Sequence, residues 1–144
     1  MKRTLFLLLW LLLSGCAGAL RAQQLIFADS VQTVDGIAEN DAPRTYRFAC
    51  ENRSDKPVVI LRVDTSCGCV KASFTRKPIA PGERGEVVVT FDPRGHEGAL
   101  YKQMPVYTSD SPRRPAVRLA LSGVVQPPRP ARSAKSAPSQ RGAQ

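Results

Sequence analysis

The stretch that decides the fold is Thr45-Tyr46-Arg47-Phe48-Ala49-Cys50-Glu51. Its residues alternate, so that Tyr46, Phe48 and Cys50 share one face, while Arg47 and Glu51 lie on the other. Apolar residues at every second position predict a β-strand with one face buried and one face in water.

Further extended runs, separated by turn residues, lie on both sides of this strand. They are residues 25–27, 31–36, 58–63, 86–92, 100–108 and 117–121, the last continuing into Val124 and Val125. Residues 93–98 are rich in glycine and predict a hairpin loop. Pro105 favours an edge or bulged position for its strand, because proline has no backbone N–H. Short strands at this spacing predict an all-β fold, an immunoglobulin-like antiparallel β-sandwich of about seven strands.

The N-terminal segment has the layout of a secretory signal peptide, which we assign to residues 1–22. A basic start, Met1-Lys2-Arg3, precedes an apolar run over residues 5–13 and then small residues. The run is shorter than the roughly 20 residues that a transmembrane helix needs. We therefore expect an exported protein.

Two cleavage sites are open. Leu13-Ser14-Gly15-Cys16 resembles a bacterial lipobox, which would place lipid on Cys16 and give a periplasmic or outer-membrane-associated lipoprotein. Cleavage after Ala19 or Ala22 would instead discard Cys16 with the signal peptide and release a soluble protein.

The sandwich domain is expected over residues 23–125 and a disordered, basic tail over residues 126–144, where Pro, Arg, Ser, Ala, Gly and Gln dominate. The tail is either a passive extension or a segment that is weakly attracted to anionic surfaces. The formal charge of the chain is +9, but the signal segment and tail carry much of it, which leaves about +3 for the domain. That modest, interspersed charge indicates ordinary surface and no nucleic-acid binding.

Three cysteines remain after Cys16, namely Cys50, Cys67 and Cys69. In an oxidising compartment, Cys50 is expected to pair with Cys67 or Cys69, or all three pack as small apolar residues. Because three cysteines cannot all pair within one chain, one thiol could instead join a partner protein.

The stretch Cys67-Gly68-Cys69 also permits two other interpretations. If it is extended, both thiols project to one face, where they could bind copper or zinc with His96 or Met104 as further ligands. A disulfide between them would require a bend at Gly68, would form a small reducible ring and would favour thiol exchange. His96 is otherwise a solvated turn residue, and Asp92 and Glu97 are turn and surface residues.

The motifs in order resemble those of domain-of-unknown-function family 1573. They are Phe48-Ala49-Cys50-Glu51-Asn52, Val63-Asp64-Thr65-Ser66-Cys67-Gly68-Cys69-Val70, Ile79-Ala80-Pro81-Gly82-Glu83-Arg84-Gly85-Glu86-Val87, Val89-Thr90-Phe91-Asp92, Lys102 and Leu121-Ser122-Gly123-Val124. The resemblance implies an exported single sandwich, related to association domains of the hydin and major sperm protein type. Cys50 departs from the pattern, which has a larger apolar residue there.

The sequence has no Ser-His-Asp order, paired-acid motif or phosphate loop, so we do not expect an enzyme. We expect a non-catalytic binding or assembly module of the cell envelope that contacts an envelope protein or a surface polymer and needs no cofactor. The alternative is a periplasmic protein that binds a soft metal or exchanges thiols through Cys67 and Cys69.

Overall fold

A computed structural model describes residues 25–130 and contains eight strands and no helix in that range. The strands are β1 (Leu25–Phe27), β2 (Val31–Ala38), β3 (Arg44–Asn52), β4 (Ile60–Val63), β5 (Val70–Phe74), β6 (Arg84–Phe91), β7 (Gly98–Thr108) and β8 (Val117–Gln126). The predicted signal segment, Cys16 and most of the predicted tail lie outside the described residues. No helix in the described range is long and apolar enough to span a membrane.

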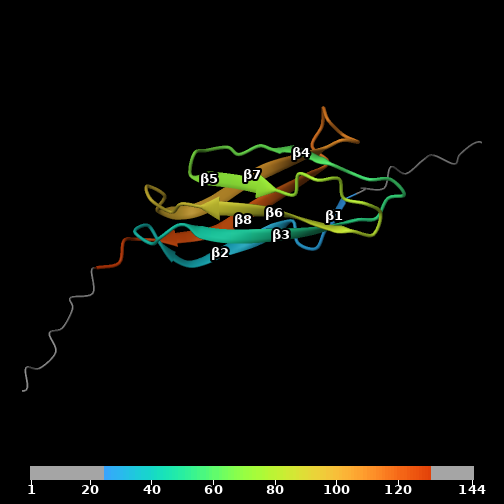
Figure 1. The fold of residues 1–144 in the computed structure, drawn as a ribbon. Coiled ribbons are helices and arrows are strands. Elements are labelled where there is room, and N and C mark those ends of the chain that lie inside the picture. Colours follow the sequence, from blue (N-terminus) through green and yellow to red (C-terminus); the bar gives the residue numbers. More distant parts are fainter. Residues whose placement is uncertain (1–24, 131–144) are drawn as a thin grey trace, which may run out of the picture.

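The strands form two stacked four-stranded sheets (Figure 1). Sheet A has the order β1-β3-β6-β5, and sheet B has the order β2-β8-β7-β4. All neighbouring strands are antiparallel except β2 and β8, which are parallel. This confirms the predicted all-β sandwich and adds one strand and one parallel pairing to it.

The core lies between the sheets and contains the inward-facing residues of both. The largest fully buried side chains are Phe48, Phe91, Ile37, Ile60, Ile79, Met104, Leu119 and Leu121. Burial of each such side chain contributes roughly 1.5–3 kcal/mol, so the alternation seen in the sequence is the main source of stability. Tyr46, Phe48 and Cys50 all face this core, as predicted.

The first strand-like segment changes sheets between β1 and β2. Phe27 pairs with β3 in sheet A, whereas the carbonyl of Ser30 already accepts a 2.7 Å hydrogen bond from Ala120 of β8 in sheet B. Two side chains also join the sheets here. Gln32 of β2 donates to the carbonyl of Arg47 on β3 at 2.6 Å, and Arg44 of β3 donates to the carbonyl of Asp35 on β2 at 2.8 Å. This long side of the sandwich is therefore bridged by backbone and side chains.

The loop over residues 93–98 is not a hairpin loop. It joins β6 of sheet A to β7 of sheet B, so it crosses from one layer to the other. The residues of a crossing loop and of a hairpin loop have the same composition, because both require turns. Only the pairing partners of the flanking strands separate the two cases.

Pro105 also differs from its predicted edge or bulged position, since β7 is an inner strand between β8 and β4 and its pairing with β8 has no register shift at Pro105. Its carbonyl accepts a 3.0 Å hydrogen bond from the amide of Asp64, directly after β4 ends. The N and C=O of one residue in a strand point the same way, so the missing N–H of Pro105 also faces the end of β4. A proline is tolerated there because the neighbouring strand has ended.

The tail begins with ordered contacts. Asn40, in the turn after β2, bonds to both main-chain groups of Arg129, at 2.9 and 3.0 Å. The Arg129 guanidinium donates to the carbonyl of Gly36 at 2.8 Å and lies 3.3 Å from the Asp41 carboxylate. Arg129, which lies in the predicted tail, is therefore bonded to the turn between β2 and β3.

Candidate functional site

The turn that contains Cys67 and Cys69 lies where the chain passes from β4 to β5. The amide of Val70 donates to the carbonyl of Cys67 at 3.3 Å, which closes the turn. The carbonyl of Cys69 accepts a 2.8 Å hydrogen bond from the amide of Asp92, directly after β6. The second cysteine is therefore fixed to the start of the β5–β6 pairing.

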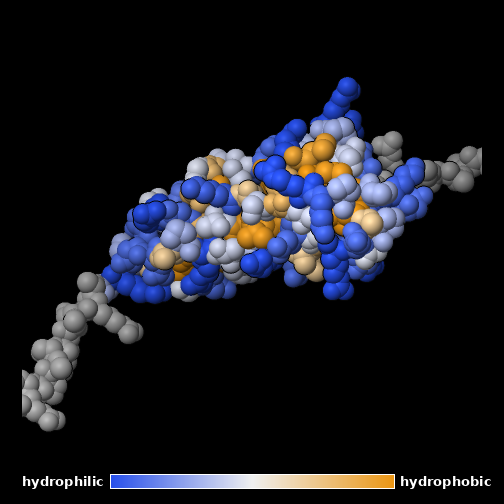
Figure 2. Space-filling model, in the orientation of Figure 1, coloured by the Kyte–Doolittle hydropathy of each residue, from blue (hydrophilic) through white to orange (hydrophobic). Residues whose placement is uncertain are grey.

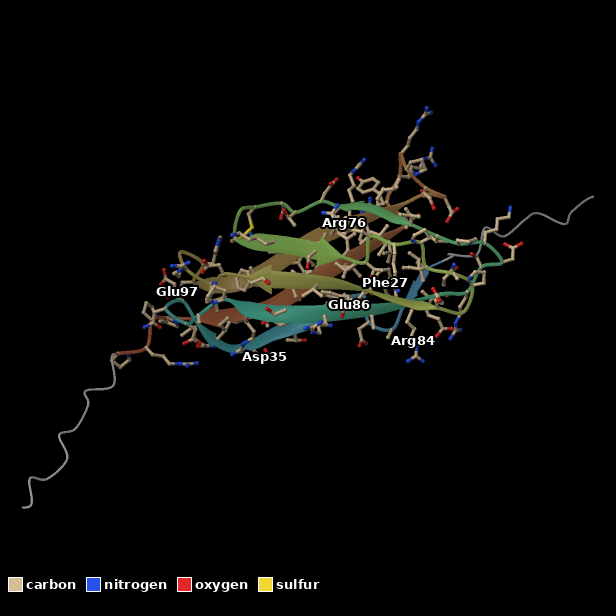
Figure 3. The ribbon with its side chains drawn as sticks, in the orientation of Figure 1. Phe27, Asp35, Arg76, Arg84, Glu86 and Glu97 are labelled. Carbon is tan, nitrogen blue, oxygen red and sulfur yellow. A yellow bond between two sulfur atoms is a disulfide. The ribbon has the colours of Figure 1, made fainter. Side chains whose placement is uncertain are left out.

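A disulfide joins Cys67 to Cys69, whose Cα atoms lie 5.3 Å apart, and appears as the yellow bond before β5 (Figure 3). Both cysteines are half-buried and pack against the edge of the core. Gly68, between them, is exposed and does not have a positive φ. The bend thus uses a backbone conformation that other residues also adopt.

Cys50 is not part of this disulfide, so the pairing differs from the two that we expected. Cys50 lies opposite Gly85 on β6, whereas Cys69 lies beside Asp92. Gly85 and Asp92 are seven residues apart, which corresponds to about 23 Å at the usual rise of a strand. A disulfide needs Cα atoms within about 7 Å, so Cys50 cannot reach either partner without refolding of sheet A.

Cys50 is a free thiol that is only 2% exposed. Burial raises its pKa, and a hydrogen bond with the backbone of Gly85 opposes this rise in part. A Cβ at Gly85 would lie 3.3 Å from the Cys50 sulfur and would overlap the side chain of Ile79. The glycine therefore leaves room for Ile79 and Cys50 to fill this part of the core.

The metal ligands considered from the sequence do not gather at this turn. Met104 is fully buried between the sheets, opposite Leu119 on β8. The His96 ring packs near Phe91, with 6.1 Å between ring centroids. Within residues 25–130, no group of three or more His, Cys, Asp or Glu residues is placed to hold a metal ion. Because thiolates are the metal ligands, binding at Cys67 and Cys69 would require reduction of the disulfide.

The loop beside the disulfide is fixed by an ion pair. Arg94 Nε donates to both carboxylate oxygens of Asp92, at 2.9 and 3.1 Å. These side-chain hydrogen bonds, together with one from the Arg94 amide, lower the Asp92 pKa to about 2. Asp92 is thus a positioning residue of the loop, and its amide also bonds to Cys69. The sequence predicts only a turn residue at this position.

Sequence reasoning missed the role of Asn52, which is fully buried. Its side-chain amide donates to the carbonyls of Lys56 and Ile79, at 2.7 and 2.8 Å. Its side-chain oxygen accepts from the amide and hydroxyl of Ser54, at 2.9 and 2.7 Å. Gly82 donates to its backbone carbonyl at 2.7 Å. The Asn followed by a polar turn was the available signal, since such residues often bond to nearby backbone groups.

Comparison with protein families gives one match. A family model described as "Protein of unknown function (DUF1573)" matches residues 25–125, which are nearly all of the described residues. A comparison with curated proteins gave no match.

Solved structures show the same fold at low sequence identity. The ASH/PapD-like domain 7 of human CEP192 matches with a TM-score of 0.59 and 14% identity, over 75% of this chain and 89% of that domain. A protein of unknown function from Porphyromonas gingivalis W83 matches with a TM-score of 0.57 and 18% identity, over 74% of this chain and 50% of that chain. The Vibrio cholerae VesB protease matches with a TM-score of 0.53 and 15% identity, over 71% and 32%.

These matches establish a similar sandwich and nothing about activity. The chain spans about half the length of the Porphyromonas protein and about a third of the protease. A sandwich of this type therefore occurs as one part of longer proteins, as in domain 7 of CEP192 and in the protease.

Proposed function

This chain belongs to the DUF1573 family of proteins of unknown function, and we propose that it is a non-catalytic binding and assembly module of the cell envelope. It is exported and held at a membrane by lipid on Cys16. Its partner is an envelope protein or a surface polymer.

The outer face of sheet B supports this proposal. Val31, Tyr101 and Val124 project from β2, β7 and β8 and are 51%, 60% and 49% exposed. Register places small or polar residues between them on the same face, namely Thr33, Ala99, Ala120, Gln103 and Ser122. Exposed apolar and aromatic side chains on one surface are typical of interaction sites.

The outer face of sheet A has a different chemistry. Arg47 of β3 and Glu86 of β6 form an ion pair across the strands at 3.1 Å, and Arg84 and Glu51 lie 4.0 Å apart on the same strands. Figure 3 shows Glu86 and Arg84 along the outside of this sheet. Paired charges of this kind are typical of a solvated face. The contrast supports our assignment of the outer face of sheet B as the binding face.

The test is cross-linking of the full-length chain in living cells, followed by purification of its cross-linked partners. Tyr101→Asp with Val124→Asp should remove the cross-linked species, because two charges would interrupt the apolar surface. Thr45→Asp, on the exposed outer face of sheet A, is the matched control and should retain them. The proposal fails if both variants keep the same cross-linked species while melting like the wild type.

A second candidate function rests on the Cys67–Cys69 disulfide, which is half-exposed in a turn. A thiolate of a partner would attack one sulfur, form a mixed disulfide and release the other sulfur as a thiolate. A second thiol of the partner would then complete the exchange, leaving Cys67 and Cys69 reduced and the partner oxidised. The reduced pair could also bind Cu(I) or Zn(II) through two thiolates.

Equilibration with glutathione, followed by alkylation and mass spectrometry, tests this candidate. A redox role predicts that the Cys67–Cys69 bond is reduced within the range of the glutathione couple. A metal role predicts that the reduced protein binds Cu(I) stoichiometrically and that Cys67→Ser and Cys69→Ser abolish binding. A bond that resists glutathione, together with unchanged metal content in both variants, would exclude the candidate.

A further inference from the structure

The two long sides of the sandwich differ in how they are closed. On one side, the chain crosses from β1 to β2, and the side chains of Gln32 and Arg44 bond across to β3 and β2. On the other side, the edge strands β4 and β5 are joined by the turn that contains the disulfide, and beyond their other ends by backbone hydrogen bonds between Val58 and Ile79 at 2.8 and 3.0 Å. Strand β5 pairs with β6 alone among the described strands. Sheet A is therefore open along β5.

The backbone of β5 offers free hydrogen-bonding groups on this side. The carbonyl of Cys69 and the amide of Thr75 bond towards β6, at 2.8 and 3.0 Å. Backbone groups of an antiparallel strand alternate in direction, so those of Ala72 and Phe74 point away from β6. Within residues 25–130 no strand pairs with them. An edge of this kind is a template for an added strand.

Apolar side chains line the same side. Val63 at the end of β4 and Phe74 at the end of β5 are only half-buried against the core, and Leu61 of β4 is 48% exposed. Figure 2 shows apolar surface gathered over β4 with hydrophilic side chains beside it. A strand beside β5 would cover part of this surface with every second side chain.

The charge along β5 has one sign. Lys71, Arg76 and Lys77 are exposed, and residues 65–82 contain no acid. The Arg76 guanidinium lies 5.2 Å from the centre of the Phe74 ring, which holds its charge at the edge (Figure 3). Among the ion pairs of the described residues, none includes any of these three cations. Their charges are thus available to a ligand.

We propose that the open edge of β5 binds an extended, acidic segment of another protein by strand addition. Main-chain bonds to Ala72 and Phe74 provide the pairing, and Lys71, Arg76 and Lys77 select acidic side chains. This site goes beyond the proposed function, because it is a different surface from the outer face of sheet B. A second copy of β5 is disfavoured as the occupant, because pairing would bring the like charges of both copies together. Residues 131–144 are disfavoured for the same reason, since they contain three cations and no acid.

The probe is a short synthetic peptide in which valine and glutamate alternate, with a valine–lysine peptide as its counterpart. The acidic peptide should bind the full-length protein, measured by fluorescence anisotropy, and the basic peptide should not. Amide hydrogen exchange shows where on the protein the peptide binds. Binding should slow exchange at Ala72 and Phe74, while the amide of Ser73, which already faces β6, should change little.

Ala72→Pro tests the backbone contact, because it removes an outward-facing N–H and leaves the bonds to β6 in place. It should weaken binding of the acidic peptide about tenfold or more, since a hydrogen bond is lost and the ring obstructs pairing. Ala72→Ser keeps the N–H and is the matched control, with affinity expected within about twofold of wild type.

Charge reversal tests whether the three cations select an acidic peptide. It also tests the proposal if Ala72→Pro fails to fold. Lys71→Glu, Arg76→Glu and Lys77→Glu together should weaken binding of the acidic peptide about tenfold or more and admit the basic peptide. Arg113→Glu, Arg114→Glu and Arg118→Glu, three exposed cations elsewhere, make the same change in net charge and should leave affinity unchanged.

Three results of the peptide-binding experiments would overturn the inference. They are no binding of the acidic peptide, equal binding of both peptides, and equal loss of affinity in the two charge-reversed proteins. Sedimentation that shows a dimer abolished by Ala72→Pro would also overturn it, because the occupant would then be a second copy. None of these outcomes depends on Tyr101 or Val124, so the proposed function is judged separately by its own cross-linking test.

Discussion

The side-chain amide of Asn52 bonds to the carbonyl of Ile79, which lies 27 residues further along the chain, and both residues are buried. This bond joins two sequence motifs, because Asn52 ends the stretch Phe48–Asn52 and Ile79 begins the stretch Ile79–Val87. The motifs pair again where Cys50 lies opposite Gly85. The two motifs therefore occur in one chain because their residues bond to and pair with each other in the fold.

Replacement of Asn52 by alanine should lower the free energy of unfolding by roughly 2–4 kcal/mol, because several buried backbone groups would lose their partners. Asn40→Ala is the control, since its amide bonds to the main chain of Arg129 on the exposed surface, and its cost should be about 0.5 kcal/mol or less. Urea unfolding with an unchanged slope measures both. Equal losses in the two variants would contradict the central role of Asn52.

A methyl group should be tolerated at Gly68 and damaging at Gly123. A Cβ at Gly123 would lie 2.9 Å from the backbone N and C of Val34, and backbone in a paired strand cannot move aside. Gly123→Ala should therefore cost about 1–3 kcal/mol. Gly68 has open space around it and no positive φ, so Gly68→Ala should cost about 0.5 kcal/mol or less and keep the disulfide. Thermal melting compares the two, and similar melting temperatures would contradict this prediction.

The Asp92 carboxylate should titrate at about 2 in the folded protein, because Arg94 donates hydrogen bonds to it. Its pKa is lower folded than unfolded, so the stability it contributes is present above pH 4 and is lost as the pH falls from about 4 to about 2. Arg94→Gln should return the Asp92 pKa towards 3.8. Carboxyl chemical shifts recorded during a pH titration measure this, and titration at the same pH in both proteins would show that Arg94 does not set the pKa.

Alkylation of the native protein should modify none of Cys50, Cys67 and Cys69, because the first is buried and the other two are bonded. Mild reduction should expose Cys67 and Cys69 to the reagent, since both are half-exposed. Cys50 should react only after unfolding, because burial excludes the reagent and raises the thiol pKa. Peptide mapping by mass spectrometry assigns each label. A cross-link between the Cys50 and Cys67 peptides would contradict the pairing described here.

The individual strands were predictable because alternation is a local property. Even β5, which we did not predict, carries the pattern, since Val70, Ala72 and Phe74 alternate with Lys71 and Ser73. Its five residues directly follow the cysteine stretch, so the alternating pattern is too short to separate from the turn before it. The pairing partner of each strand was not predictable, because strands pair through backbone groups that are the same in nearly every residue. The loop over residues 93–98 therefore looked like a hairpin although it crosses between sheets.

By itself, the sequence determined the all-β class, the inward-facing residues of β3 and the family, because these depend on periodicity and on motifs of adjacent residues. Tertiary structure decided which cysteines meet. Cys50 and Cys69 both adjoin β6, but at opposite ends of it, and only the strand register reveals the separation. It likewise decided that β5 is an open edge with unpaired cations, since an edge exists only once all the other strands have found their neighbours.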